Sequence, residues 1–172
     1  MRLAITGVMC SGKTTIANYL INKYNYNKFS FADDIKLLAT EIFGMKNKNR
    51  KLLQDFGTKM KEIDNLIWIN RLDKKIKLAN SNNIIIDDLR YPDELEYLKK
   101  NNFKILKLDI SKELQLLRLK KTYPETYLEH YNCSNHESEQ YIKNIEYDYY
   151  YNITDANENN IYEIIDTIIT IQ

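Results

Sequence analysis

Residues 7–14 carry the clearest chemical signal in the sequence. They read Gly-Val-Met-Cys-Ser-Gly-Lys-Thr, which matches the pattern G-x-x-x-x-G-K-[ST] at every fixed position. Glycines let such a loop curl until successive backbone N–H groups point at phosphate oxygens, and the helix that follows adds partial positive charge. Lys13 would reach the β- and γ-phosphates of ATP, and the Thr14 hydroxyl would ligate Mg²⁺. We predict ATP and Mg²⁺ as cofactors, bound by Gly7, Cys10, Ser11, Gly12, Lys13, Thr14 and Thr15.

The position of this loop supports the same interpretation. A β-rich run at residues 2–6 precedes it, and a helical pattern at residues 13–23 follows it. A chance match would occur in on the order of one chain in a hundred at average residue frequencies. An ordinary glycine turn is therefore the weaker interpretation. GTPases also need a base-reading Asn-Lys-x-Asp after a strand, and this chain has none.

A P-loop protein that is not a GTPase could be a kinase of small molecules. Besides the loop, such a kinase needs a second carboxylate near the metal and positive charge over the phosphates. Asp87 and Asp88 end the most apolar strand pattern, and Arg90 lies just beyond it. Ligands of parallel sheets bind beyond the carboxyl ends of the strands, so these side chains are candidates for meeting a metal and an anion. A strand-end turn is the alternative for the two aspartates, and an ion pair is the alternative for Arg90.

Further positive charge lies on a predicted helix that ends in Arg118, Lys120 and Lys121. This helix runs into a segment without a clear pattern, so residues 118–139 could close over the site as a lid that excludes water. A solvated helix face is the alternative interpretation of the cluster.

Strand and helix patterns alternate along the whole chain, which predicts an α/β fold with a parallel sheet covered on both faces. We expect a single domain over residues 1–172. The predicted strands are at residues 2–6, 28–31, 83–87, 103–110 and 149–154. The predicted helices are at residues 13–23, 33–43, 49–79 (in two pieces broken near Gly57, with Asp64 as the N-cap of the second), 92–100, 111–121, 137–146 and 160–171.

Composition narrows the class of protein. The chain has 25 basic and 24 acidic residues, whereas a nucleic-acid-binding domain usually shows a basic excess on one face. Two cysteines are too few for a disulfide framework, and no apolar run is long enough to span a membrane. We therefore expect a cytoplasmic protein with small-molecule nucleotide substrates and with neither nucleic acid nor membrane as a partner.

With these motifs placed, the chain resembles the deoxynucleoside monophosphate kinases of large DNA viruses and tailed bacteriophages. Besides the glycine loop, three segments match in order: residues 29–36 resemble "SFADPLK", residues 53–58 with Trp68 resemble "LQ-x-x-GT…W", and residues 88–94 resemble "DVRFPNE". Residues 136–139 more weakly resemble "H-x-SE". Asp34 stands where proline is commoner. Lys59 and Lys61 stand near the place of a usual arginine, and a lysine lacks the two-pronged grip on phosphate.

The resemblance implies a P-loop NTPase fold with a five-stranded parallel sheet, of the nucleoside monophosphate kinase type. It implies acceptor-binding helices at about residues 33–79, Asp88 beside the metal, and an acceptor phosphate on Arg90. A homodimer is also possible. Trp68 could pack in the core or stack on a base. The implied catalytic residues are Lys13, Arg90 and Arg118, and the implied substrate-binding residues are Asp33, Lys36, Gln54, Thr58, Trp68, Arg90 and Glu139.

The function expected on these grounds is transfer of the γ-phosphoryl group of ATP to a (deoxy)nucleoside monophosphate. One alternative is a P-loop kinase of another phosphorylated acceptor, such as dephospho-coenzyme A or phosphomevalonate. A second is a nucleotide-binding regulatory protein without turnover. The sequence leaves the base and sugar preference of the acceptor open.

Overall fold

The computed structural model describes residues 1–132, 137–154 and 160–170. The chain divides into two units, one formed by Met1–Lys28 together with Asn82–Gln172, and the other by Phe29–Ser81. The second unit covers nearly the same segment as the helices that the sequence predicts to bind an acceptor.

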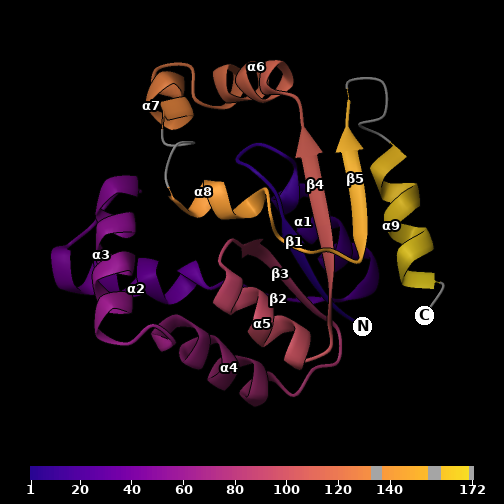
Figure 1. Cartoon of the computed structure of the whole chain (residues 1–172), viewed down its shortest axis with the longest axis horizontal. Coiled ribbons are helices and arrows are strands. Elements are labelled where there is room, and N and C mark those ends of the chain that lie inside the picture. The colour runs from indigo at the N-terminus through magenta and orange to yellow at the C-terminus, as the bar shows by residue number, and fades with distance from the viewer. Residues whose placement is uncertain (133–136, 155–159, 171–172) are drawn as a thin grey trace. The chain divides into compact units, whose positions relative to one another are not determined.

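The first unit is built on a five-stranded sheet with the strand order β2-β3-β1-β4-β5 (Figure 1). Strand β1 pairs in parallel with β3 and β4, and β4 pairs in parallel with β5. The predicted fold class, a five-stranded parallel sheet with helices on both faces, is confirmed. The strands are β1 (Arg2–Thr6), β2 (Asn27–Phe29), β3 (Ile84–Leu89), β4 (Phe103–Ile110) and β5 (Tyr149–Ile153).

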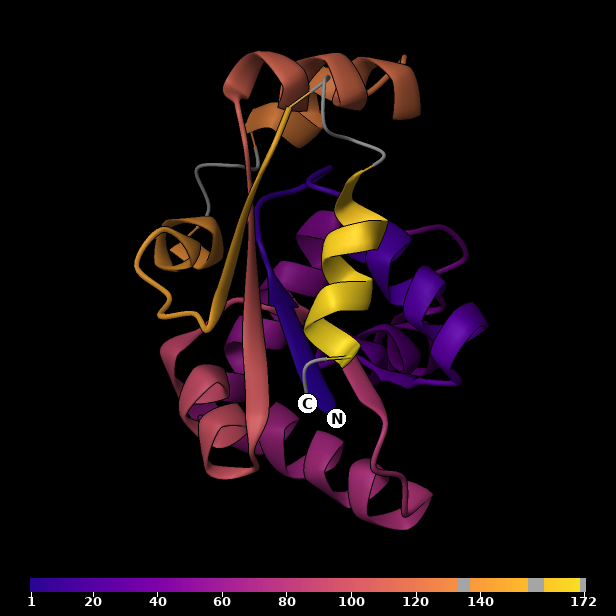
Figure 2. The same ribbon diagram turned by 90° about the vertical axis from the view of Figure 1, so that its right-hand side faces the viewer.

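Helices cover both faces of this sheet (Figure 2). On one face, Leu3 and Ile5 of β1 belong to a buried cluster that includes Ile16 of α1 and Ile165 of α9. On the other face, α5 packs against β4. The alternation of side chains along each strand separates these two sets, and both are apolar because both are covered. The helices of this unit are α1 (Lys13–Tyr24), α5 (Pro92–Lys100), α6 (Lys112–Thr122), α7 (Tyr127–Asn132), α8 (Glu137–Ile142) and α9 (Ile161–Thr170).

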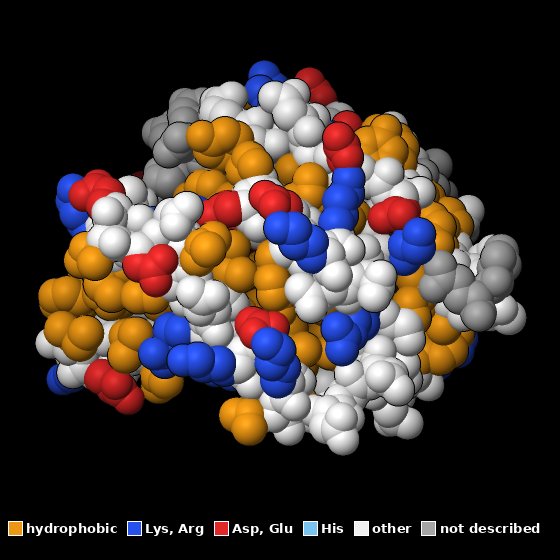
Figure 3. All heavy atoms as spheres, turned by 60° about the horizontal axis from the view of Figure 1, so that its bottom comes forward, with side chains coloured by type: hydrophobic (Ala, Val, Ile, Leu, Met, Phe, Trp, Pro, Cys, Tyr) orange, Lys and Arg blue, Asp and Glu red, His pale blue; other side chains and the backbone are white. Residues whose placement is uncertain are grey.

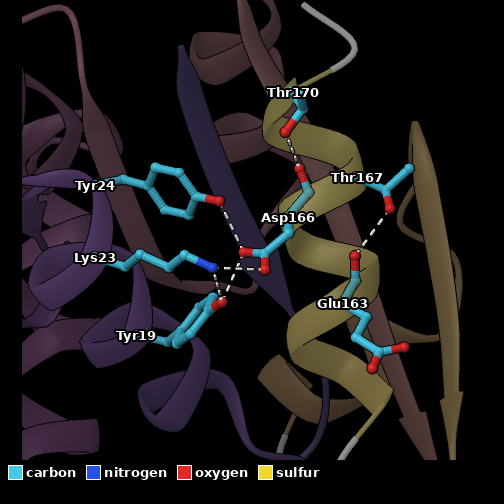
Figure 4. Close-up of polar contacts among 7 residues, drawn as sticks. All are labelled: Tyr19, Lys23, Tyr24, Glu163, Asp166, Thr167 and Thr170. Atoms are coloured by element: carbon cyan, nitrogen blue, oxygen red, sulfur yellow. Dashed lines mark hydrogen bonds and ion pairs between the residues drawn. The ribbon is translucent and has the colours of Figure 1, made fainter.

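One carboxylate joins the last helix to the helix that follows the glycine loop (Figure 4). Asp166 of α9 accepts hydrogen bonds from the Tyr19 hydroxyl at 2.6 Å and the Tyr24 hydroxyl at 2.8 Å. The Lys23 ammonium lies 2.7 Å from its other oxygen. Hydrogen bonds from Lys23 and then from Tyr19 lower the pKa of Asp166 to about 2. Three side chains of α1 therefore converge on one charge of α9.

The second unit consists of helices α2 (Ala32–Phe43), α3 (Arg50–Ile63) and α4 (Ile67–Ala79). The predicted break near Gly57 is wrong, because α3 continues through this residue and ends at Ile63. A Cβ atom at Gly57 would lie 3.2 Å from the Ile35 side chain, so the glycine serves close packing of α2 on α3. A helical glycine costs roughly 0.5–1 kcal/mol relative to alanine, which is why propensity alone suggests a break.

Other element boundaries also differ from the prediction. Asp64 caps the end of α3 and is not the N-cap of α4, although its side chain accepts a hydrogen bond from the Leu66 amide at 3.0 Å. Strand β2 stops at Phe29, and β3 continues to Leu89. Helix α7 has no counterpart in the prediction, because six residues are too few to show a helical period. Helix α8 ends at Ile142, four residues before the predicted end.

Charged side chains of both signs are distributed over the face drawn in Figure 3, where Lys and Arg side chains lie among Asp and Glu side chains. In the described part of the chain, no helix combines the length and the apolar character needed to cross a bilayer.

The contacts of Asp166 give a prediction with a defined pH dependence. Because its folded pKa lies below the ordinary value of 3.8, the charged form stabilises the fold above pH 4, and this stabilisation is lost as the pH falls through about 2. We expect Asp166→Asn to lower the thermal unfolding midpoint at pH 7 and to approach the wild type as the pH falls toward 2. Asp55→Asn on α3, whose exposed carboxylate pairs with Lys51, is a control for removing a surface charge. Equal midpoints at pH 7 would contradict the prediction.

Candidate active site

The glycine loop joins β1 to α1 through a backbone that only particular residues can adopt. The φ angles of Gly7, Cys10 and Gly12 are 150°, 64° and 91°, all in the region that favours glycine. A Cβ atom at Gly7 would lie 2.5 Å from the Leu108 carbonyl oxygen and 2.7 Å from Ser11 Oγ. Position 7 therefore accepts no side chain, and the loop passes directly against β4.

The carbonyl groups of four consecutive loop residues accept hydrogen bonds from side chains. Lys13 Nζ donates to the carbonyls of Gly7 and Val8 at 2.6 and 2.8 Å. Two side chains of α6 donate to the next two residues, Gln115 to Met9 and Arg118 to Cys10, each at 3.0 Å. The Ser11 amide donates to the Val8 carbonyl at 3.3 Å, so these contacts fix the peptide units of the loop at the start of α1, where an anion could be bound.

Ser11 provides an independent indication of a ligand in this loop. The side chain is fully buried, and its hydroxyl has no hydrogen-bond partner among the described residues. A buried polar group without a partner costs about 1–3 kcal/mol, so such a group needs an explanation. A phosphate oxygen would supply the missing acceptor. The loop thus fits the triphosphate that the sequence predicts.

A carboxylate of β3 lies beside the first turn of α1. Thr14 Oγ1 donates to Asp87 Oδ2 at 3.3 Å, and Lys28 Nζ from β2 lies 2.6 Å from the same oxygen. Mg²⁺ in phosphoryl-transfer sites is typically held by one or two carboxylates together with the substrate's phosphates. The described residues contain no cluster of three or more His, Cys, Asp or Glu side chains that could hold a metal without such help. Thr14 and Asp87 therefore suit a nucleotide-bound Mg²⁺.

The structure distinguishes the two aspartates that the sequence places at this strand end. Side chains alternate along a strand, and Ile85 lies in the cluster that contains α1, so Asp87 faces α1 as well. Asp88 has the opposite parity, and its charge acts on Glu94 of α5. The sequence prediction names Asp88 beside the metal, whereas the contact with Thr14 belongs to Asp87.

Glu94 shapes the turn that carries Arg90. Its Oε2 accepts hydrogen bonds from the backbone amides of Arg90 at 2.8 Å and Tyr91 at 3.0 Å. Burial, and then the charge of Asp88, raise the pKa of Glu94 to about 8 against the opposing effect of the two backbone hydrogen bonds. Sequence reasoning missed this role, although a glutamate two residues after Pro92 at a helix start is a recognisable capping signal.

The other predicted binding residues lie on the second unit. Asp33 is exposed and pairs with Lys36 at 3.2 Å on the first turns of α2. Gln54 is half-buried and Thr58 is exposed on α3. These four side chains lie on helix surfaces, and their roles in binding stay predictions.

Trp68 is buried on α4, where its ring nitrogen donates to the Gly57 carbonyl at 3.1 Å. Its ring meets Phe56 edge to face, with 5.9 Å between the centroids. These contacts match the core-packing interpretation of this residue, and a contact with a base stays a prediction.

Asp34, which replaces the family's proline, has a structural reason. Its buried carboxylate lies 2.8 Å from Arg71 Nε and 2.7 Å from Lys75 Nζ, so it ties α2 to α4.

The structure describes only part of the predicted lid, residues 118–139. Residues 112–122 and 127–132 are helical. Glu139 falls in α8 with its side chain outside the described part, and His136 lies outside the described residues.

Comparison with known proteins places this site in a family. A family model described as an AAA domain, AAA_18, matches residues 3–142. The chain belongs to this AAA domain family. The match includes the glycine loop together with Asp87 and Arg118, which contact Thr14 and the Cys10 carbonyl, and it also includes Arg90.

Relatives of this AAA domain point to kinases. A protein of Acanthamoeba polyphaga mimivirus named "Putative deoxynucleotide monophosphate kinase" is 25% identical over 143 residues, which cover 62% of this chain and 72% of that protein. The shikimate kinase of Acinetobacter baumannii, solved with shikimate, has a TM-score of 0.58 and 15% identity over 98% of this chain and 92% of that one. The shikimate kinase of Bacteroides thetaiotaomicron has a TM-score of 0.56 and 14% identity over 99% and 98%. The two structures establish a shared P-loop kinase fold, and the family and the mimivirus protein indicate a phosphotransferase.

The buried Glu94 gives a prediction for stability. Its folded pKa of about 8 exceeds the ordinary 4.5, so the folded protein binds the proton more tightly and loses stability as the pH rises between these values. Glu94→Gln keeps an oxygen that can accept both backbone hydrogen bonds but carries no charge. We expect the variant to match the wild type near pH 4, below the ordinary pKa, and to be more stable at pH 9 by about 1 kcal/mol or more.

Chemical denaturation at a series of pH values measures this difference. Glu96→Gln on the exposed side of the same helix is the matched control, since its carboxylate pairs with Lys100 in solvent. If Glu94→Gln is less stable than the wild type at pH 9, the prediction is contradicted, because the ionised Glu94 carboxylate then does not destabilise the fold.

Proposed function

We propose that this chain transfers the γ-phosphoryl group of ATP to a deoxynucleoside monophosphate, which releases ADP and the corresponding diphosphate. The observation that carries the proposal is the convergence of Lys13, Thr14 and Asp87 on a loop whose buried Ser11 hydroxyl has no partner within the described part of the chain. The acceptor class is supported by the similarity to the mimivirus protein and by the resemblance of residues 29–36, 53–58 and 88–94 to this kind of kinase.

The loop residues act on the phosphates of ATP. Lys13 can exchange its two carbonyl partners for the β- and γ-phosphate oxygens, and the Ser11 hydroxyl can donate to a third oxygen. Bound between Thr14, an aspartate of β3 and the nucleotide, Mg²⁺ would neutralise charge that develops on the phosphates. Arg118 donates to the Cys10 carbonyl of the loop, and we propose that its charge helps to neutralise the phosphates. The protein thus supplies position and positive charge, and the reaction requires no strong base.

The acceptor carries a phosphate of its own, and the negative charges of this phosphate and of the γ-phosphate of ATP repel each other. We propose that Arg90, in the turn fixed by Glu94, binds this phosphate and supplies part of the compensating charge. Asp33, Lys36, Gln54, Thr58 and Trp68 of the second unit, together with Glu139, are the proposed contacts to the rest of the acceptor.

A panel of acceptors tests the proposal directly. We expect ATP-dependent ADP release with one or more deoxynucleoside monophosphates, and Lys13→Ala should reduce its rate by at least about 100-fold while the protein stays folded. Lys100→Met, which removes an exposed lysine of α5, is the matched control. The panel also contains ribonucleoside monophosphates, dephospho-coenzyme A and phosphomevalonate. Release with only one of the last two would replace the acceptor class, and ATP binding without release would favour a regulatory protein.

Arg90 gives a separate prediction about the acceptor. Arg90→Lys keeps the charge but loses the two-pronged contact with phosphate, so we expect the KM for the acceptor to rise about 10-fold or more with the KM for ATP nearly unchanged. Arg2→Lys is the control, because Arg2 lies at the other end of β1 and donates to the Asn101 carbonyl. An acceptor KM equal to that of the wild type would remove Arg90 from the acceptor site.

A further inference from the structure

Lys28 is a charged residue at the candidate site to which the proposed reaction assigns no role. It lies on β2, and its ammonium is 2.6 Å from Asp87 Oδ2 at the end of β3. The Asp87 side chain is only 8% exposed, whereas the Lys28 side chain is 30% exposed. The lysine therefore reaches from a partly open position to a nearly buried carboxylate.

The ion pair with Lys28 offsets the cost of burying the Asp87 carboxylate. An ionised carboxylate removed from water is costly unless a cation or several donors compensate it. Thr14 provides one neutral hydrogen bond at 3.3 Å, which is long for an O–H donor and a carboxylate. The Lys28 ammonium provides the charge.

Lys28 and Thr14 meet the same atom of Asp87. Both contacts are to Oδ2, so the ammonium stands next to the hydroxyl that the P-loop motif assigns to Mg²⁺. Two cations held by one carboxylate oxygen repel each other strongly in a poorly solvated site. A metal that binds at Thr14 and Asp87 must therefore weaken or displace the lysine contact. Lys28 has a flexible stem and enough exposure to move away.

We propose that Lys28 is a positioning residue that holds the Asp87 carboxylate beside Thr14 and competes with Mg²⁺ for it. This inference rests on the proposed use of Mg²⁺ and ATP, but not on the identity of the acceptor. In the absence of metal, Lys28 compensates the buried charge and keeps the carboxylate aimed at α1. When Mg²⁺ arrives with ATP, the ammonium gives up the carboxylate, and the apparent affinity for Mg²⁺ is lower than it would be without the lysine.

A neutral side chain of similar length tests this competition. We expect Lys28→Met to lower the thermal unfolding midpoint of the ligand-free protein and to lower, by about threefold or more, the Mg²⁺ concentration that gives half-maximal ATP binding in calorimetry. Lys28→Arg should keep both values close to those of the wild type. Lys107→Met removes another lysine of the same unit, one that donates to the Lys143 carbonyl, and controls for the change in net charge.

Two results would overturn the proposal. A less stable Lys28→Met protein with an unchanged Mg²⁺ requirement would make the pair a structural link between β2 and β3. A higher Mg²⁺ requirement would mean that Lys28 helps to hold the nucleotide. A protein that binds no ATP at any Mg²⁺ concentration would instead contradict the proposed function, so the two failures are distinguishable.

A measurement on the wild-type protein covers the case in which Lys28→Met does not fold. The rate at which an amine-acylating reagent modifies Lys28 is followed by mass spectrometry with ATP alone and with ATP and Mg²⁺. Release of the ammonium by the metal should raise this rate about twofold or more, with Lys107 as the internal reference. An equal rate under the two conditions would refute the competition.

Discussion

The absence of a side chain at position 7 is the constraint on which the candidate site depends. Any Cβ atom there would meet the Leu108 carbonyl of β4 at 2.5 Å, so the chain can leave β1 and turn into the loop only through glycine. This close passage fixes where the next residues stand. Ser11 is fully buried next to it, and Lys13 and Thr14 begin α1. The position of the loop's functional residues therefore depends on the close contact between Gly7 and β4.

Several elements then hold the loop in place through polar contacts. Helix α6 supports it with Gln115 and Arg118, and Lys13 closes it from within. Strands β2 and β3 contribute Lys28 and Asp87 at the start of α1. Side chains thus occupy the carbonyls of residues 7–10, and the buried Ser11 hydroxyl has no partner among the described residues. These contacts suit the proposed phosphoryl transfer, in which the protein mainly positions charges.

The sequence predicted the parts of this site that depend on neighbouring residues and missed those that depend on pairing in space. The glycine loop is a local pattern, and the sheet followed from clear alternation of strands and helices. The choice between Asp87 and Asp88 needed the parity of β3, which the sequence does not reveal because Ile84, Ile85 and Ile86 are all buried. Lys28 was out of reach, because its role depends on β2 lying beside β3 in the sheet order. The predicted break at Gly57 was wrong because glycine has a low helix propensity, whereas its close contact with Ile35 in the folded protein favours a helix without a side chain there.

The Asp166 contacts carry a consequence for sequence variation. One carboxylate on α9 serves two tyrosines and a lysine on α1, so none of these positions can change independently at low cost. A relative with an apolar residue at position 166 would leave two hydroxyl groups and an ammonium to find new partners. Tyr19, Lys23, Tyr24 and Asp166 should therefore be replaced together among homologues, as a covarying set that links the two ends of the chain.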